Sequence, residues 1–341
     1  MPRKPRVEFA GAVYHVMSRG DHGEAIYQDD ADRQRFLDSL AEACQKTGWL
    51  VHAYVLMPNH YHLLLETPKA NLVAGMHWLQ GTYTNRYNRR HGLHGHLFQG
   101  RYKPLLIEPD DDAYFPQVST YIHLNPVRAG MATPDRHGLE RFPWSSFPAY
   151  LGQTGRRPAW LCLDRVLAAL DLADSARGRD AYAAHVVEQA LQAIGGAGKG
   201  DLQRQWKAIR RGWCLGSDSF RTRMGERLDG VLQEHRSGSY LGPEIHEHQY
   251  HTAEQLLSAG LAAVGLTPDQ LPSLRKTDLR KQAVAWLIRK HTTVRNAWVS
   301  EALRMGHEVN VSQAVARVDR AESSELARLK TAVTSTLKPR G

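Results

Sequence analysis

An almost uninterrupted apolar stretch, WLVHAYVLMPNHYHLLLE at residues 49–66, is the feature that most constrains how this chain folds. It is rich in aliphatic, β-branched and aromatic residues, a composition typical of strands in a sheet. Pro58 and Asn59 interrupt the stretch, so it is predicted to form either one long strand or a hairpin. A sheet therefore lies at the centre of the first half of the chain.

The segments around this stretch alternate between two periodicities. Residues 12–20 and 96–108 read as strands, whereas residues 29–49, 71–92 and 110–130 have apolar residues at helical spacing. The last of these helices is predicted to end at Asn125, because a residue before proline resists the α conformation. The pattern predicts an α+β or α/β sandwich with one mostly antiparallel sheet.

The rest of the chain is predicted to be mainly helical. A stretch rich in Pro, Ser and Gly at 142–158 marks the exit from the first domain, and helical patterns follow at about 160–230 and 252–336. We therefore expect an N-terminal domain over residues 1–150, a helical connecting region over 151–250 and a helical DNA-binding region over 251–341. The DNA-binding role depends on the charge and the motif described below.

Composition excludes some classes of protein and favours a nucleic-acid partner. The chain has no apolar run long enough to span a membrane, no pattern of a signal peptide and three scattered cysteines, which together predict a cytoplasmic protein. Its net charge is +9. Residues 1–150 contribute 16 Lys and Arg against 15 Asp and Glu, and residues 151–341 contribute 28 against 20. The positive surplus lies in the second half, as expected if that half contacts a polyanion.

Two histidines stand one residue apart at the start of LLLE. In a strand His60 and His62 point to the same face, so their imidazoles can converge on one metal ion. Most metals need a third ligand, and packing against the core is the alternative. A second candidate lies in STYIHLNPVRAG, where Tyr121 and Asn125 are four residues apart and share a helix face. A tyrosine can attack a phosphate, and an amide oxygen is a hard metal ligand.

The segments MPNHYHLLLE, LFQGRYKPLLIE and YIHLNPVRAGM…WSSF together resemble the single-tyrosine HUH nucleases, specifically the REP-associated tyrosine transposases. The resemblance covers about residues 7–150. It implies a ferredoxin-like sandwich with an antiparallel sheet, in which His60, His62 and Asn125 bind the metal ion and Tyr121 is the nucleophile. It further implies cleavage and strand transfer of single-stranded DNA, at palindromic repeats folded as hairpins, through a 5′-phosphotyrosine. Mg²⁺ or Mn²⁺ is the expected cofactor, although this ligand set also permits zinc.

Basic side chains between aromatic ones suit a single strand of DNA, whose phosphates they contact while rings stack on bases. On this ground we expect DNA contacts in the first domain from the following residues: Arg86, Arg89, Arg90, Arg101, Lys103 and Arg128.

The segment NAWVSEALRMGHEVNVSQAVARVDRA (296–321) is predicted to form two helices separated by a break at Gly306. The second helix turns apolar residues inward and leaves Gln313 and Arg317 outward, as in a recognition helix. The block from about 276 to 320 resembles the DNA-binding end of the DnaA initiator. We therefore expect this region to add affinity for hairpin or duplex DNA.

Two other functions fit the same residues. A non-catalytic DNA-binding regulator could keep the fold without the chemistry, and it would form no covalent adduct with DNA. An RNA-processing nuclease on a similar sheet would cleave without a covalent intermediate.

Overall fold

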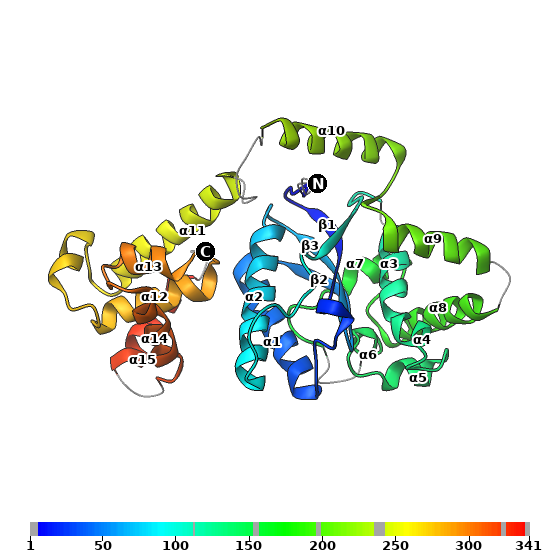
Figure 1. Ribbon diagram of the computed structural model, residues 1–341, viewed down its shortest axis with the longest axis horizontal. Helices are drawn as coiled ribbons and strands as arrows, with labels where there is room; N and C mark the ends of the chain where they lie inside the picture. Colours follow the sequence, from blue (N-terminus) through cyan, green and yellow to red (C-terminus); the bar gives the residue numbers. More distant parts are fainter. Residues whose placement is uncertain are drawn as a thin grey trace. The chain divides into compact units, whose positions relative to one another are not determined.

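Four strands with two intervening helices lie in the described residues up to 107. A computed structural model describes residues 6–111, 113–152, 157–195, 199–234, 243–321 and 325–337. The order is β1 (Ala12–Arg19), α1 (Asp30–Thr47), β2 (Leu50–Met57), β3 (His60–Thr67), α2 (Leu72–His91) and β4 (Lys103–Ile107), with a short 3-10 turn η1 (Asp21–Gly23) after β1. Figure 1 shows this succession in blue and cyan.

The sheet has the order β2-β3-β1-β4-β5, and its first four strands are antiparallel to their neighbours. A β-α-β-β-α-β chain with this strand order is a ferredoxin-like sandwich, so the predicted α+β fold is confirmed. β5 (Cys214–Leu215) adds to β4 in parallel. This two-residue strand was not predicted, since so short a segment has no periodicity to read.

The long apolar stretch is a hairpin. β2 and β3 pair from Met57 and His60 outward, so that only Pro58 and Asn59 form the turn. The backbone N–H of Ile26 donates to the Pro58 carbonyl and holds the turn from outside the hairpin. Both strands are almost entirely buried, which accounts for their near-continuous apolar sequence.

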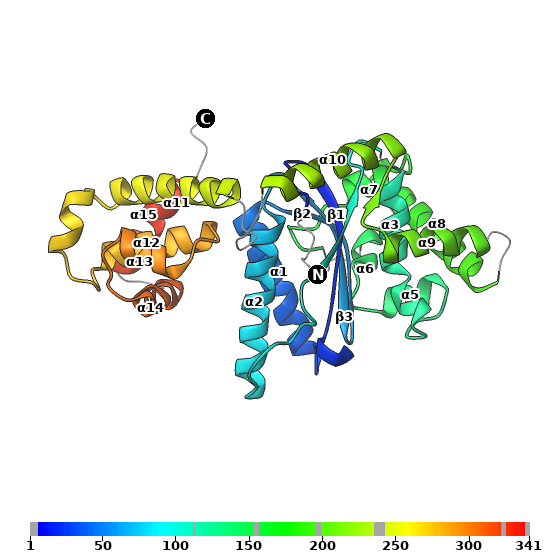
Figure 2. The same ribbon diagram turned by 45° about the horizontal axis from the view of Figure 1, so that its top comes forward.

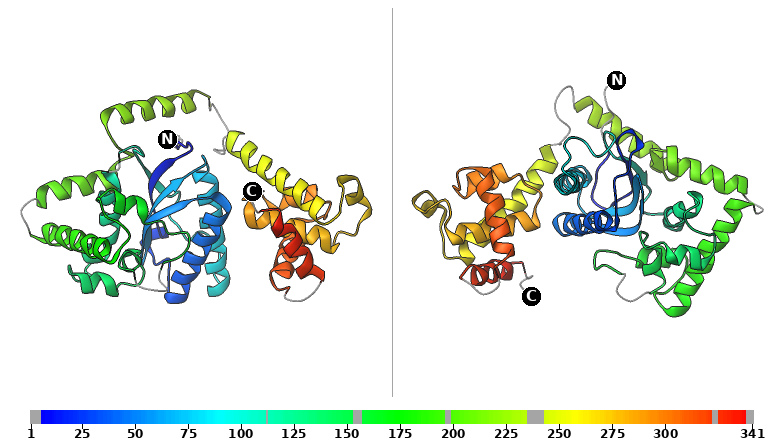
Figure 3. Two further views of the ribbon diagram at one scale, coloured as in Figure 1. Left: turned by 180° about the vertical axis from the view of Figure 1, so that it is seen from behind. Right: turned by 60° about the horizontal axis from the view of Figure 1, so that its bottom comes forward.

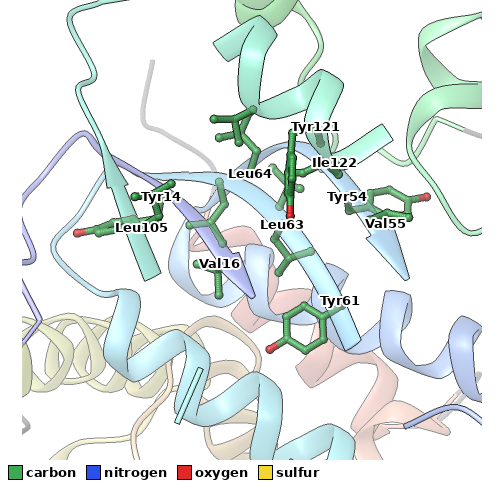
Figure 4. Packing of buried hydrophobic residues seen from close by; sticks show 14 of the residues in the cluster. Tyr14, Val16, Tyr54, Val55, Tyr61, Leu63, Leu64, Leu105, Tyr121 and Ile122 are labelled. Carbon is green, nitrogen blue, oxygen red and sulfur yellow. The ribbon is translucent and has the colours of Figure 1, made fainter. Parts of the chain in front are cut away.

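The two faces of the sheet are covered by different helices. α1 and α2 lie on one face, and α3 (Tyr114–His123) lies on the other (Figures 1 and 2). Figure 4 shows buried side chains from β1, β3 and α3 packed together at the sheet. Pro116 is the third residue of α3, in the first turn, where a missing N–H costs little.

The segment after α3 differs from the sequence-based prediction. The helix was expected to end at Asn125, but α3 ends at His123 and Asn125 begins a second short helix, α4 (Asn125–Arg128). Pro126 occupies the second position of α4, where its ring is compatible with the helix and its lack of an N–H leaves no bond unmade. The break therefore precedes the proline by two residues.

The residues after 150 continue the same hydrophobic core. The short helices are α5 (Arg136–Arg141), α6 (Phe147–Tyr150) and α7 (Asp164–Ala168), and the longer ones are α8 (Ala176–Ile194), α9 (Lys199–Arg211) and α10 (Asp218–Glu234). Tyr182 of α8 and Trp206 of α9 are buried in the core that contains the sheet. One compact unit accordingly comprises Met1–Cys44 and Gly48–Tyr240, and the other comprises Gln45–Thr47 and Leu241–Gly341. The predicted division into regions 1–150, 151–250 and 251–341 stays a prediction.

The second unit is helical and has a core of its own (Figure 3). Its elements are α11 (Pro243–Ala263), η2 (Pro268–Ser273), α12 (Leu279–His291), α13 (Asn296–Ala302), α14 (Glu308–Asp319) and α15 (Glu325–Ser335). The predicted break between α13 and α14 is present, with Gly306 at a φ of 85° that favours glycine. Lys281 is buried and donates to the carbonyls of Leu271 and Leu274, which ties the preceding turns to α12.

No helix in the described part of the chain is long and apolar enough to cross a membrane.

Candidate active site

The end of β1 and the start of β3 bring the candidate residues together. In the register of these antiparallel strands Arg19 pairs with His60 and Met17 pairs with His62. Because side chains alternate along a strand, His60 and His62 share one face of the sheet, as predicted, and His15 of β1 lies on that same face. This is the face that α3 covers.

A local hydrogen bond fixes the protonation of His60. The Asn59 amide nitrogen donates to the carbonyl of Gly23 at 2.9 Å, so the amide oxygen of Asn59 is the atom that lies 2.7 Å from Nδ1 of His60. An amide oxygen only accepts, and Nδ1 of His60 must therefore carry the proton. The lone pair on Nε2 of His60 is left for a ligand.

His62 has a partner from the neighbouring strand. Its Nδ1 lies 2.8 Å from Nε2 of His15, and the two rings are stacked with centroids 5.0 Å apart. The rings of His60 and His62 are 5.1 Å apart and meet edge to face. His15 is 0% exposed and His62 is 4% exposed, so this contact lies in the interior of the protein.

Tyr121 reaches this cluster from the opposite layer. Its ring points from α3 toward the sheet (Figure 4), and its centroid lies 5.8 Å from that of His62 and 5.7 Å from that of His15. The side chain is only 2% exposed. Trp206 of α9 contacts the ring at 6.0 Å between centroids, and the guanidinium of Arg128 lies over both rings at 4.8 and 4.9 Å.

Asn125 lies one turn beyond Tyr121, and its side chain is held by the main chain. Its amide nitrogen donates to the carbonyls of Tyr121 at 2.9 Å and Ile122 at 3.4 Å. These bonds use the donor side of the amide, so the oxygen of Asn125 remains available as an acceptor or a metal ligand. The i, i+4 relation between Tyr121 and Asn125 that the sequence suggested survives the break between α3 and α4.

Burial and nearby cations keep all three imidazoles neutral. Burial is the main cause that lowers the pKa of His60 to about 4, with Arg19 and Arg128 adding to it. Burial likewise lowers the pKa of His15 to about 3, with a smaller effect of Lys103. The pKa of His62 is lowered well below its ordinary value, again chiefly by burial. Neutral imidazole is the form that binds metal ions.

The donor set fits a divalent ion. His60 and His62 have their Nδ1 atoms engaged and their Nε2 atoms without a hydrogen bond within the described residues, and Asn125 offers an amide oxygen. Two imidazoles and one amide oxygen suit Mg²⁺, Mn²⁺ or Zn²⁺ to different degrees. Over the described ranges no group of three or more His, Cys, Asp and Glu could hold a metal ion. Asn125 as the third protein ligand beside this pair of histidines stays a prediction.

The basic residues predicted to contact DNA fall into two groups. Arg86 forms an ion pair with Glu42 at 2.8 Å, and Arg90 pairs with Asp29 at 2.6 Å and Asp32 at 2.5 Å. These two arginines hold α2 to α1 and to the residue before it. The others, Arg89, Arg101, Lys103 and Arg128, are exposed. Lys103 donates to the carbonyl of Arg210, and Arg128 stacks on Tyr121 as described above.

The outward face of α14 carries the other predicted contacts. Gln313 and Arg317 are exposed, and Arg317 donates to the side chain of Gln282 on α12 at 3.3 Å. Gln313 and Arg317 line a hollow of about 640 Å³ together with Arg320, Glu325 and Leu326.

Three residues of the site were missed in the sequence. His15 and Arg19 belong to a strand whose alternation was recognised, but their closeness to His62 and His60 depends on pairing between strands more than 40 residues apart. Trp206 lies on an amphipathic helix, where a tryptophan reads as an ordinary core residue. A hint was present in AVYHVMSRG, since a histidine flanked by apolar residues must either be packed with a partner or bear a function.

Comparison with known proteins bears on the first unit. Residues 9–125 match the family model "Transposase IS200 like". A solved structure of a REP-associated tyrosine transposase bound to a REP hairpin is similar to this chain, with 17% identity over 46% of this chain and 89% of that one and a TM-score of 0.37. No curated protein sequence matches.

The match to the IS200-like transposase family covers residues 9–125, about a third of the chain, and the predicted family resemblance is confirmed for that region. The family match ends at residue 125 and gives the resemblance of the C-terminal region to DnaA no support.

Proposed function

We propose that the first unit cleaves and rejoins single-stranded DNA, with Tyr121 as the nucleophile. The observation that carries this proposal is the meeting of Tyr121, His60, His62 and Arg128 on one face of the sheet. The ring centroids of Tyr121 and His62 are 5.8 Å apart, and those of His60 and His62 are 5.1 Å apart. A phenol, two neutral imidazoles and a guanidinium are the groups that a phosphoryl transfer needs. The match of residues 9–125 to IS200-like transposases supports the same reaction class.

The reaction has two steps that reverse each other. The oxygen of Tyr121 attacks a phosphorus of the DNA backbone and loses its proton, while the bond from phosphorus to the 3′-oxygen breaks and that oxygen takes up a proton. The product is a 5′-phosphate ester of Tyr121 and a free 3′-OH. A 3′-OH then attacks the phosphotyrosine, which restores the phosphodiester and the phenol.

His60, His62 and Asn125 would hold Mg²⁺ or Mn²⁺. The ion would supply Lewis-acid stabilisation of the charge on the phosphate. The chain itself contributes the orientation of Tyr121, which α3 aims at the sheet, and the positive charge of Arg128, which lies over the tyrosine ring. Arg19 and Lys103 add positive charge on the same side of the sheet, where the phosphate backbone would lie.

The substrate we propose is a palindromic repeat folded as a hairpin. The solved transposase that resembles this chain is described as bound to a REP hairpin. In this chain Arg89, Arg101 and Lys103 are exposed and basic, as contacts to a phosphate backbone require. Gln313 and Arg317 of the second unit would contact duplex or hairpin DNA through α14.

One observation favours a second function. Tyr121 is 2% exposed beneath Trp206, and a buried nucleophile suits a DNA-binding protein of this fold that does no chemistry. The two functions differ in whether a covalent bond to DNA forms.

The test uses hairpin oligonucleotides with palindromic sequences, labelled at either end and incubated with the protein and Mn²⁺. On a denaturing gel the 3′-labelled fragment should migrate with the protein, because its 5′ phosphate is bound to Tyr121, and the 5′-labelled fragment should run free. Tyr114→Phe is the matched control, since it alters a tyrosine of the same helix outside the site. Hairpin binding without any adduct would favour the non-catalytic function, and cleavage without an adduct would favour a water-dependent nuclease.

A further inference from the structure

The two histidines of the site are held by partners of different kinds. His60 faces an amide oxygen of Asn59, which can only accept, so its proton is fixed on Nδ1. His62 faces another imidazole, that of His15, at 2.8 Å. An imidazole nitrogen either donates or accepts, and geometry alone therefore leaves two arrangements for this pair.

Only one of the two arrangements leaves His62 able to bind a metal ion. A single hydrogen lies between Nδ1 of His62 and Nε2 of His15 when both rings are neutral. If it belongs to His62, the Nε2 of His62 has a free lone pair. If it belongs to His15, the proton of His62 sits on Nε2 and occupies the atom that must bind the metal.

Within the described residues, the contact with His62 is the only hydrogen bond of the His15 side chain. Nδ1 of His15 has no hydrogen-bond partner within the described residues, and the ring is 0% exposed. A buried polar atom without a hydrogen-bond partner destabilises the fold. We therefore expect His15 to have a role that offsets this loss of stability.

We propose that His15 is a positioning residue that accepts a hydrogen bond from Nδ1 of His62 and thereby keeps Nε2 of His62 free as a ligand. The inference rests on the proposed function, since it assigns a role toward the metal site. Partners of this kind orient ligand histidines and fix their tautomer in metal sites generally, and their loss weakens metal binding by about 10- to 100-fold.

Metal binding without DNA tests the proposal directly. Mn²⁺ is titrated into the full-length protein and free Mn²⁺ is followed by electron paramagnetic resonance. His15→Leu should raise the dissociation constant by about 10- to 100-fold. His15→Gln should bind nearly as well as the wild type, because the glutamine oxygen reaches about as far as Nε2 and can accept the same bond.

His52→Leu is the matched control. His52 is a buried histidine of β2, and its neighbours are the Cys162 carbonyl and Glu66 rather than the site histidines. It should lose stability as His15→Leu does and keep its Mn²⁺ affinity. An equal loss of affinity in both variants would mean that His15 acts only through stability, and would overturn the proposal.

The tautomer is read independently by nitrogen NMR of the metal-free protein. Long-range ¹⁵N–¹H correlations should place the proton of His62 on Nδ1 in the wild type and in His15→Gln. A proton on Nε2 of His62 in the wild type would overturn the proposal, as would His15→Gln binding Mn²⁺ as weakly as His15→Leu. If His15→Leu does not fold, His15→Gln and the NMR measurement decide.

The titration also separates failure of this inference from failure of the proposed function. If the wild type binds Mn²⁺, His60→Ala does not, and His15→Leu binds it as well as the wild type, only the proposed role of His15 is overturned. A wild type that binds no Mn²⁺, or binds it equally well in His60→Ala, removes the metal site itself and both proposals with it.

Discussion

The two units differ in how they present the residues on which their proposed roles depend. In the first, Tyr121, His62 and His15 are buried, and each contacts the others through rings or hydrogen bonds. In the second, Gln313 and Arg317 stand on the outer face of α14 and are exposed. Chemistry at phosphorus needs groups fixed in place, whereas phosphate binding needs charge that DNA can reach. Changes in the first unit should therefore affect cleavage, and changes in the second should affect affinity.

The largest effect is expected from Tyr121→Phe, which should reduce cleavage and adduct formation to background. The ring and its contacts with His62 and Trp206 remain, and the hydroxyl makes no hydrogen bond within the described residues. The melting temperature of this variant should consequently stay close to that of the wild type. An adduct that persists in this variant, or that peptide mass places on Tyr114, would contradict the assignment.

The next largest effect is expected from His60→Ala. Cleavage in Mn²⁺ should be lost because one of the two proposed imidazole ligands is gone, while hairpin binding should change little because it draws on phosphate contacts elsewhere. Cleavage rates and gel-shift affinities measured on the same hairpin separate the two. A loss of affinity as large as the loss of cleavage would mean that the site binds DNA rather than acting on it.

Removing the second unit by ending the chain at residue 240 tests the other side of the comparison. Hairpin affinity and its dependence on salt should fall, because each lost phosphate contact lowers the slope of log K against log salt by roughly 0.9 for duplex and 0.7 for single strands. Adduct formation at saturating DNA should persist. An unchanged slope would exclude a DNA-binding role for α13 and α14.

A smaller effect is expected from single arginines, and it should depend on whether they are paired. Arg317→Ala should lower the salt slope by roughly 0.9 if α14 contacts duplex phosphate. Arg90→Ala should leave the slope unchanged and lower the melting temperature, because Arg90 already binds Asp29 and Asp32. The reverse pattern would show that the predicted contact of Arg90 with DNA is real and that of Arg317 is not.

The smallest effect concerns stability and pH in the first unit. Burial raises the pKa of Glu8 to about 7, so the folded protein binds a proton that the unfolded chain releases near 4.5. The stability that this proton contributes is present below pH 4.5 and is lost as pH rises through 7. Glu8→Gln keeps an acceptor for the backbone N–H of Val73 and should remove this pH dependence, on the order of 1–3 kcal/mol.

Denaturant unfolding of both proteins between pH 4.5 and 8 measures the difference. Parallel curves for the wild type and Glu8→Gln would show that Glu8 is solvated and titrates as an ordinary carboxylate.

How far the sequence predicted the molecule depends on the distance between the residues concerned. The helices α1 and α2 followed from periodicity, the apolar stretch was left open between one long strand and a hairpin, and the ferredoxin-like sandwich followed from the family resemblance. His60 and His62 were recognised because two such residues on one strand share a face by geometry. Tyr121 and Asn125 were paired for the same local reason.

What could not be predicted depends on contacts between distant segments. Arg86 and Arg90 were read as free cations, but their carboxylate partners lie 44 to 61 residues earlier in the chain. His15 and Trp206 join the site through strand pairing and through a helix that follows the transposase-like region. No pattern within a short window contains such information.

The partners of the two histidines also differ in when they become available during folding. Asn59 belongs to the same turn as His60, whereas His15 is 47 residues from His62 and reaches it only after the chain has closed a loop that includes α1. Local contacts form early, and distant strand pairs form late. A hairpin of β2 and β3 alone would carry the imidazoles of His60 and His62, but only His60 would already have the partner that fixes its proton on Nδ1. Tight Mn²⁺ binding during refolding would then report the docking of β1, and the ion would stabilise only chains in which that docking is complete.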